Sequence, residues 1–279
     1  MIKLNYEDGK EHIHVLSFGG GTQSTALTLY ALEHGINGVK PDYIIFSDTG
    51  WEPENVYEWV DKINNYIKER YDKEIIIINK KNIRDDILKG VETGSRFASM
   101  PFFTKSETGE KGMIRRQCTE EYKIEPVNQK IRELLGYKPR QMIREMVHVW
   151  KGISIDEIHR VKPIQLRWQE AEHPLVDDLW WDRSKCIHYV ESLGLGTPVK
   201  SSCIGCPFHD NNMWRDLKIN DPESFADAVY IDQRIRNLER MNGECYLHQS
   251  RMPLDQVDFA IDQMDIFEML GECEGMCGV

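Results

Sequence analysis

The sequence predicts an α/β fold in which helices cover both faces of a parallel sheet, with a cysteine-containing C-terminal part. Two observations predict it. Short apolar runs alternate with longer amphipathic segments over the first 80 residues, and a glycine-rich turn joins the first run to the first amphipathic segment. Strand–helix–strand repeats at this spacing form parallel sheets with right-handed crossovers.

Each element of this repeat has its own signal. The apolar runs HIHVLS, DYIIFS and EIIIIN predict strands over residues 12–17, 42–47 and 74–79. Apolar residues at helical spacing predict a helix over residues 22–34. A second helix is expected over residues 53–70, with proline at its start, where a missing N–H costs nothing.

The rest of the chain is less regular. We expect a fourth strand over residues 147–153, a mobile loop over 93–118, a helix over 221–242 and another helix after residue 253. The pattern suggests a nucleotide-binding core over residues 1–165 and a C-terminal extension over residues 166–279 that carries a CxxC motif.

Composition is that of a soluble globular protein, with 41% hydrophobic and 29% charged residues. No apolar run is long enough to span a membrane, and the first residues have no apolar signal core, so we expect a cytoplasmic protein without a membrane partner. The net charge of -11 argues against simple electrostatic binding of nucleic acid. Residues 111–144 are locally basic, either as a solvated helix face or as a surface for an anionic substrate.

The glycine-rich turn is a candidate phosphate site. Glycines let the backbone approach phosphate oxygens, and the N–H groups at the start of the next helix attract anions. An ordinary tight turn is the alternative, and the Walker pattern is absent. The candidate residues are Ser17, Phe18, Gly19, Gly20, Gly21, Thr22, Gln23 and Ser24.

The end of the second predicted strand adds Asp48, Thr49 and Gly50. Ligands of open α/β sheets bind at the carboxyl ends of the strands, so these residues are expected beside the glycine-rich turn.

These motifs, SFGGGTQS and DTGWEPENVY, resemble those of the phosphoadenylylsulfate (PAPS) reductase family within the PP-loop superfamily. Residues 152–160 and the segment Pro174-Leu175-Val176-Asp177 are similar to two further family segments, in the same order. The resemblance implies binding of ATP, or of APS or PAPS, with Mg²⁺. It adds Gly152 and Arg160 to the nucleotide site and implies catalytic roles for Asp48 and Arg160.

The sequence departs from these patterns at two positions. Gln23 stands where many ATP pyrophosphatases carry Asp, which favours the reductase branch, and Ser154 replaces an Arg of the family pattern. Locally, Ser154 and Glu157 have the spacing of a capping box, which predicts that Ser154 caps a helix.

Cysteines predict a metal or redox centre, because disulfides are rare in reducing compartments. Cys203 and Cys206 form a CxxC motif, and Cys118 lies in a segment that resembles iron–sulfur adenylylsulfate reductases and the ATPase component of DNA phosphorothioation systems. The resemblance implies a 4Fe-4S cluster on Cys118, Cys203 and Cys206, with zinc as the alternative, and Cys118 is also a candidate catalytic residue. Gln117 replaces an adjacent cysteine ligand.

The identity of a fourth ligand is therefore not assigned. The candidates are Cys277, which we favour, and Cys273, Cys245 and His209; an iron with an open position is the other reading. Cys186 and Cys245 are isolated and are otherwise expected to be small buried apolar residues.

Together, these motifs favour adenylation-dependent sulfur transfer to a nucleobase or nucleic acid. A sulfur donor protein would be a partner, and Arg115, Arg116 and Lys123 are candidates for the substrate side. Reduction of APS or PAPS is the alternative, although the C-terminal motif of those reductases has only a weak counterpart around Cys273. A nucleotide-sensing subunit of a larger complex is a third reading.

Overall fold

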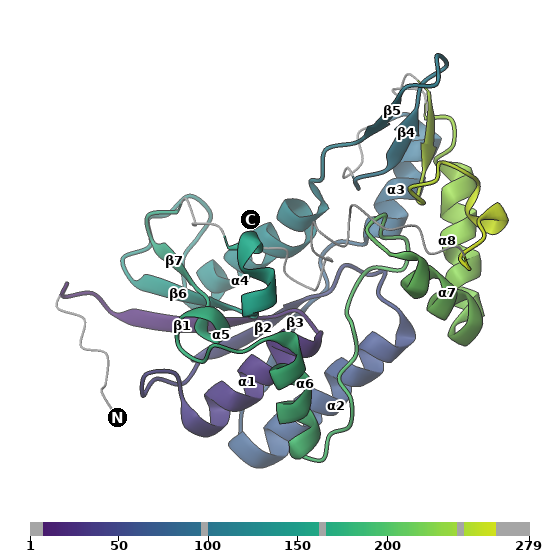
Figure 1. Cartoon of the computed structure of the whole chain (residues 1–279). Helices are drawn as coiled ribbons and strands as arrows, with labels where there is room; N and C mark the ends of the chain where they lie inside the picture. The colour runs from purple at the N-terminus through teal and green to yellow at the C-terminus, as the bar shows by residue number, and fades with distance from the viewer. Residues whose placement is uncertain (1–7, 96–99, 162–165, 239–242, 261–279) are drawn as a thin grey trace.

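The computed structural model describes residues 8–95, 100–161, 166–238 and 243–260. Its centre is a five-stranded sheet in which every pair of neighbouring strands is parallel (Figure 1). In spatial order the strands are β3 (Ile75–Ile78), β2 (Tyr43–Ser47), β1 (His12–Phe18), β6 (Met146–Lys151) and β7 (Gln169–Glu172). The predicted parallel sheet is confirmed.

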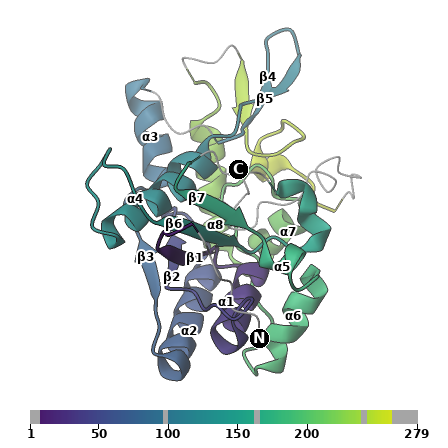
Figure 2. The same cartoon turned by 90° about the vertical axis from the view of Figure 1, so that its left-hand side faces the viewer.

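Helices cover both faces of this sheet. Three of them, α1 (Thr22–His34), α2 (Glu54–Tyr71) and α6 (Arg183–Ser192), lie on one face, and α4 (Glu125–Leu134) lies on the other (Figures 1 and 2). Alternation along β1 explains this arrangement, because Leu16 packs with the first group and Val15 packs with α4. A parallel sheet buried on both faces is what near-continuous apolar strands predict.

A second layer of structure lies beyond the carboxyl edge of the sheet (Figure 1). It contains a three-stranded antiparallel sheet, ordered β5 (Lys111–Met113), β4 (Phe103–Lys105) and β8 (Glu244–Tyr246). The helices α3 (Ile83–Thr93), α7 (Asn211–Asn220) and α8 (Pro222–Arg234) share an apolar core.

The expectation of a loop over residues 93–118 was therefore wrong for its described part, which contains the β4–β5 hairpin. The hairpin turn is closed by hydrogen bonds from Gly109 N to Ser106 O and from Ser106 N to Glu110 O, both 2.9 Å. Strands of three residues are too short to show alternation, which explains the error.

Short helical segments complete the chain. They are the π-helical turn Glu120–Ile124, the 3₁₀ turns Ile155–Arg160 and Leu254–Gln256, and α5 (Pro174–Asp177). Ser154 does not cap the turn that follows it, contrary to prediction, because its Oγ accepts a hydrogen bond from Gln23 Nε2.

The C-terminal predictions have mixed outcomes. The helix expected over residues 221–242 ends at Arg234, and the helix expected after residue 253 lies mostly outside the described residues. β7 and α6 come after residue 165 in the sequence, but they pack with the sheet and helices of the first part. The division of the chain into a core and an extension at residue 165 therefore stays a prediction. Within the described ranges, no helix is both long and apolar enough to cross a bilayer.

Candidate functional site

The glycine-rich turn lies at the carboxyl end of β1 and is fully buried. Gly20 has φ +77°, and an added Cβ would lie 3.3 Å from the Phe46 ring and from Val60, so the turn requires glycine there. Gly21 precedes α1 without a side-chain cap, whereas Asn82, Asp182, Asp210 and Asp221 cap other helices. The first turn of α1 therefore offers uncapped N–H groups to an anion.

Residues 199–202 pack against this turn from the C-terminal half of the chain. Ser201 Oγ donates a 2.7 Å hydrogen bond to Gly19 O, and Thr22 Oγ1 donates to Val199 O at 3.4 Å. These contacts bring the CxxC motif, which follows directly, to the same edge of the sheet.

Gly152 brings the end of β6 against α1. An added Cβ on Gly152 would lie 2.7 Å from Ser24 N, so the two backbones can meet only where there is no side chain. Beside this contact, Gln23 Nε2 donates to Ser154 Oγ and to Glu157 Oε2, both at 3.3 Å.

Arg160 joins the same network. Its Nη1 lies 2.6 Å from Glu157 Oε2, and both side chains are largely buried. Burial raises the pKa of Glu157, and the charge of Arg160 opposes that rise. The Glu157 carboxylate therefore contacts both the Arg160 guanidinium and the Gln23 amide. The role of Arg160 as a phosphate partner stays a prediction.

The second predicted loop, at the end of β2, is held by its own hydrogen bonds. Asp48 Oδ1 accepts from Gly50 N at 2.7 Å and from the Tyr57 hydroxyl at 3.0 Å. Thr49 Oγ1 donates to Glu52 Oε1 at 2.9 Å. Asp48 and Thr49 are both buried at the carboxyl edge beside β1.

Cys203 connects this loop to the CxxC motif. Its Sγ lies 3.3 Å from Thr49 Oγ1 and 3.5 Å from Glu52 Oε1. Burial raises the pKa of the Cys203 thiol well above its usual value; the Glu52 carboxylate adds to the rise and Lys123 opposes it. A bound cation or metal centre would reverse this balance by stabilising the thiolate.

Cys118 reaches the same place from the segment around the π-helical turn. Ser47 Oγ, at the end of β2, donates a 2.7 Å hydrogen bond to Tyr122 O, which fixes this turn across the carboxyl edge. Cys118 lies close enough to Cys203 to contribute to the raised pKa of its thiol. The fold therefore brings together two cysteines that are 85 positions apart in the sequence.

The CxxC turn is shaped by Trp51. Ile204 N donates to Trp51 O at 2.8 Å, and Cys206 N donates to Cys203 O at 3.0 Å. An added Cβ on Gly205 would lie 2.0 Å from the Trp51 ring, so glycine is required at this position. The Trp51 ring is fixed in turn by a 2.7 Å hydrogen bond from its Nε1 to Asp227 Oδ2.

Other cysteine predictions can be placed in part. Cys186 and Cys245 are fully buried in apolar cores, as expected. Cys273 and Cys277, two of the candidate fourth ligands, lie outside the described residues. His209 is buried, with Nε2 2.8 Å from Ser202 Oγ and with no partner for Nδ1 among the described residues.

Sequence reasoning missed two residues at this edge. Lys151 is buried at the end of β6, in register with Ser17, and burial lowers its pKa while Glu120 opposes the change. Glu52 is the carboxylate between Thr49 and Cys203. Lys151 could have been found from the sequence, because it is a lysine directly before Gly152 at the end of an apolar strand.

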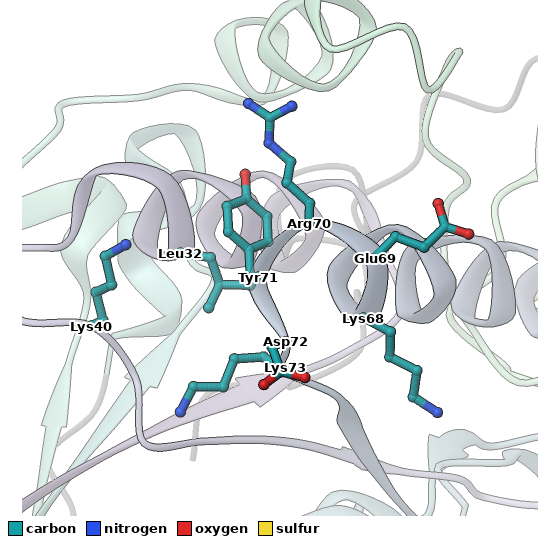
Figure 3. Close-up of a pocket in the computed structure, with 8 residues that line it drawn as sticks. All are labelled: Leu32, Lys40, Lys68, Glu69, Arg70, Tyr71, Asp72 and Lys73. Atoms are coloured by element: carbon teal, nitrogen blue, oxygen red, sulfur yellow. The ribbon is translucent and has the colours of Figure 1, made fainter.

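A pocket elsewhere takes no part in this site. It lies at the C-terminal ends of α1 and α2, and both basic and acidic side chains surround it (Figure 3). None of the predicted site residues lines it. The residues that do are Leu32, Lys40, Lys68, Glu69, Arg70, Tyr71, Asp72 and Lys73.

Comparisons with known proteins give a family match and likenesses to solved structures. Residues 13–144 match the model of the phosphoadenosine phosphosulfate reductase domain. No curated protein matches the chain. One similar solved structure is the U34-tRNA thiolase NcsA from Methanococcus maripaludis with its [4Fe-4S] cluster, at 15% identity and TM-score 0.38, covering 87% of this chain and 77% of that one.

Proposed function

Because residues 13–144 belong to the phosphoadenosine phosphosulfate reductase domain family, we propose that the chain is a PP-loop enzyme that uses an adenine nucleotide for sulfur transfer. The nucleotide would be ATP or a relative of it, and the acceptor a nucleobase or nucleic acid. The observation that carries this proposal is the contact between Cys203 Sγ and Thr49 Oγ1, at 3.3 Å. This contact joins the CxxC turn to the loop of residues 48–50, which lies beside the proposed phosphate site.

The nucleotide would lie across the carboxyl edge, with its phosphates on the N–H groups of α1 and the backbone of residues 19–21. Both hydrogen bonds to Asp48 go to Oδ1, so we assign Oδ2 to Mg²⁺, which prefers carboxylate oxygens. Lys151 and Arg160 lie at the same edge and would offset charge on the transferring phosphoryl group.

The reaction would have two bond exchanges. A substrate oxygen attacks the α-phosphorus, and the bond to the β-phosphate breaks with release of pyrophosphate. A sulfide-level donor, delivered by a partner protein, then attacks the activated carbon. The carbon–oxygen bond breaks, and AMP leaves with the oxygen.

The cysteines fit an iron–sulfur cluster. Cys118 and Cys203 act on each other electrostatically, and Cys206 follows in the same turn. Of the side chains that the structure describes, one set of three brings its ligand atoms within 4.8 Å, and it is not the cysteines. We assign a cluster to Cys118, Cys203 and Cys206 because three thiol groups at one edge are the ligand type that iron–sulfur clusters use, with zinc as the alternative that the metal assay separates. A cluster would supply an iron that holds sulfur.

Anaerobic purification tests the cluster, with visible spectra and assays for iron and sulfide. We expect a brown wild-type protein, loss of colour and iron in Cys203→Ser, and retention of both in Cys186→Ser, a control thiol buried in an apolar core. A colourless protein that contains zinc, or a Cys203→Ser variant that keeps its iron, would contradict the cluster.

Pyrophosphate release tests the adenylation step separately. With ATP, bulk tRNA or DNA, and sulfide as the donor, we expect equal amounts of pyrophosphate and AMP, lost when Asp48 is changed to Asn. Release of ADP and phosphate would contradict attack at the α-phosphorus. ATP binding without any hydrolysis would instead favour a nucleotide-sensing subunit.

Reduction of APS or PAPS is the second candidate, and the family match favours it. It requires a cysteine nucleophile and a thiol donor such as thioredoxin. Production of sulfite that is lost in Cys273→Ser would support this activity. Absence of sulfite with both nucleotides would leave sulfur transfer as the proposal.

A further inference from the structure

A row of polar side chains crosses the central sheet away from the nucleotide edge. His14, His148 and Glu170 are direct partners on the adjacent strands β1, β6 and β7, so their side chains share one face. Glu172 follows two residues later on that face. Ligand atoms of His148, Glu170 and Glu172 all lie within 4.8 Å of one another.

Hydrogen bonds hold one side of the His148 ring. His148 Nε2 lies 2.7 Å from His12 Nδ1, and His12 Nε2 lies 2.8 Å from Asp8 Oδ1. The other ring nitrogen of His148, Nδ1, is directed toward β7.

His148 Nδ1 faces two carboxylates on the neighbouring strand. It contacts Glu172 Oε1 at 2.5 Å and lies 3.8 Å from Glu170 Oε2. One imidazole nitrogen and two carboxylate oxygens from two strands thus converge on one place, and these are ligand atoms that a divalent cation accepts.

We propose that His148, Glu170 and Glu172 bind a divalent transition metal ion of the zinc class, through His148 Nδ1 and one oxygen of each carboxylate. One imidazole and two carboxylates suit zinc, and water would complete a tetrahedral shell. His12 and Asp8 hold the other ring nitrogen of His148, as groups behind metal-bound histidines do.

The required adjustments are small. Zinc bonds of about 2.0–2.1 Å place tetrahedral ligand atoms about 3.3 Å apart. The contact between His148 and Glu172 would open by less than 1 Å, and the distance between His148 and Glu170 would shorten by a similar amount. Glu170 has a side chain that is 61% exposed, so it can move without disturbing the core.

This site is separate from the proposed reaction and does not depend on it. His148 precedes Lys151 by three residues along β6, which puts it roughly 10 Å from the nucleotide edge. The ion would join β7, an edge strand, to β6. Its expected consequence is stability of the sheet edge.

Zinc titration tests the site in protein stripped with a chelator, carrying Cys203→Ser to remove one thiol from the cysteine site. Affinity is measured by competition with a chromophoric chelator, and thermal unfolding is followed with and without zinc. The test variant is Glu170→Gln, and Glu11→Gln makes the same charge change at an exposed position beside β6.

We expect one zinc ion to bind and raise Tm, with affinity lowered about tenfold or more by Glu170→Gln and unchanged by Glu11→Gln. Cobalt in the same site should lack sulfur-to-metal charge transfer. Equal affinity in the two variants, no binding in the Cys203→Ser background, or a thiolate spectrum would overturn the proposal.

Discussion

Replacement of Gly152 by alanine tests whether the first turn of α1 is the phosphate site. The added Cβ would lie 2.7 Å from Ser24 N, 2.8 Å from Ser24 Cα and 3.0 Å from Gln23 C. Ordinary contact begins at 3.4 Å, so the backbones must separate by about 0.7 Å. These atoms are backbone in a buried helix start and cannot rotate away. Overpacking of this kind costs about 1–3 kcal/mol.

Two measurements follow from that displacement. Tm should fall by about 2–4 °C for each kcal/mol in a chain of this size, as measured by circular dichroism. ATP affinity, measured by calorimetry, should fall by up to about 100-fold, because the N–H groups that face the phosphates move with the turn. The reaction rate should fall with it.

A second glycine separates the two effects. Alanine at Gly21 would lie 3.4 Å from Ser201 N, an ordinary contact, and Gly21 has φ -102°. Gly21→Ala should therefore keep the wild-type Tm, so a loss of ATP affinity in this variant would come from the added methyl group and not from displaced backbone. If folded Gly152→Ala binds ATP as tightly as wild type, the phosphates do not lie on this turn and the reasoning fails.

Three further predictions use the same assays. Asp227→Asn weakens its pair with Arg84 and the hydrogen bond from Trp51, so a chelator should remove iron faster than from wild type. Lys151→Met removes a buried ammonium whose pKa burial lowers, so Tm should stay or rise while pyrophosphate release slows. Burial lowers the pKa of His248 to about 4, so its contribution to stability is complete above about pH 6.5 and is lost as pH falls toward 4. Between pH 7 and 5, urea unfolding should show a loss up to about 2 kcal/mol larger in wild type than in His248→Gln.

Each of these has a clear contrary result. Equal rates of iron loss would mean that Trp51 does not hold the CxxC turn. Unchanged pyrophosphate release in Lys151→Met would remove this lysine from the charge balance at the edge. Parallel pH profiles would mean that His248 titrates alike in the folded and unfolded chain.

Much of the central sheet could be predicted because its elements have strong local signals. The helix expected over residues 22–34 has those bounds in the structure, since glycines flank it on both sides. β1, β2 and β3 differ from expectation by about a residue at either end. The β4–β5 hairpin was missed because its pairing with β8, about 140 positions later, is not recorded in local periodicity.

The site was predictable only as separate pieces. Residues 17–24 and 48–50 each follow a strand, and parallel strands end at one edge, which places both loops there. The contact of Cys203 with Thr49 depends on the irregular path of residues 193–203, and nothing in the sequence specifies that path. Glu52 was missed for the same reason, because its role comes from the cysteine it faces.

Buried charges of both signs gather at this edge. Lys123, Lys151 and Arg160 are each less than 9% exposed, and so are the carboxylates of Asp48, Glu52 and Glu157. Buried charges are costly, and a buried ion pair such as that of Arg160 with Glu157 adds little net stability, so a site of this kind is more often functional than structural. Under the proposed function the cations would face the phosphates and Asp48 would hold Mg²⁺, so the proposed ligand would use groups of both signs.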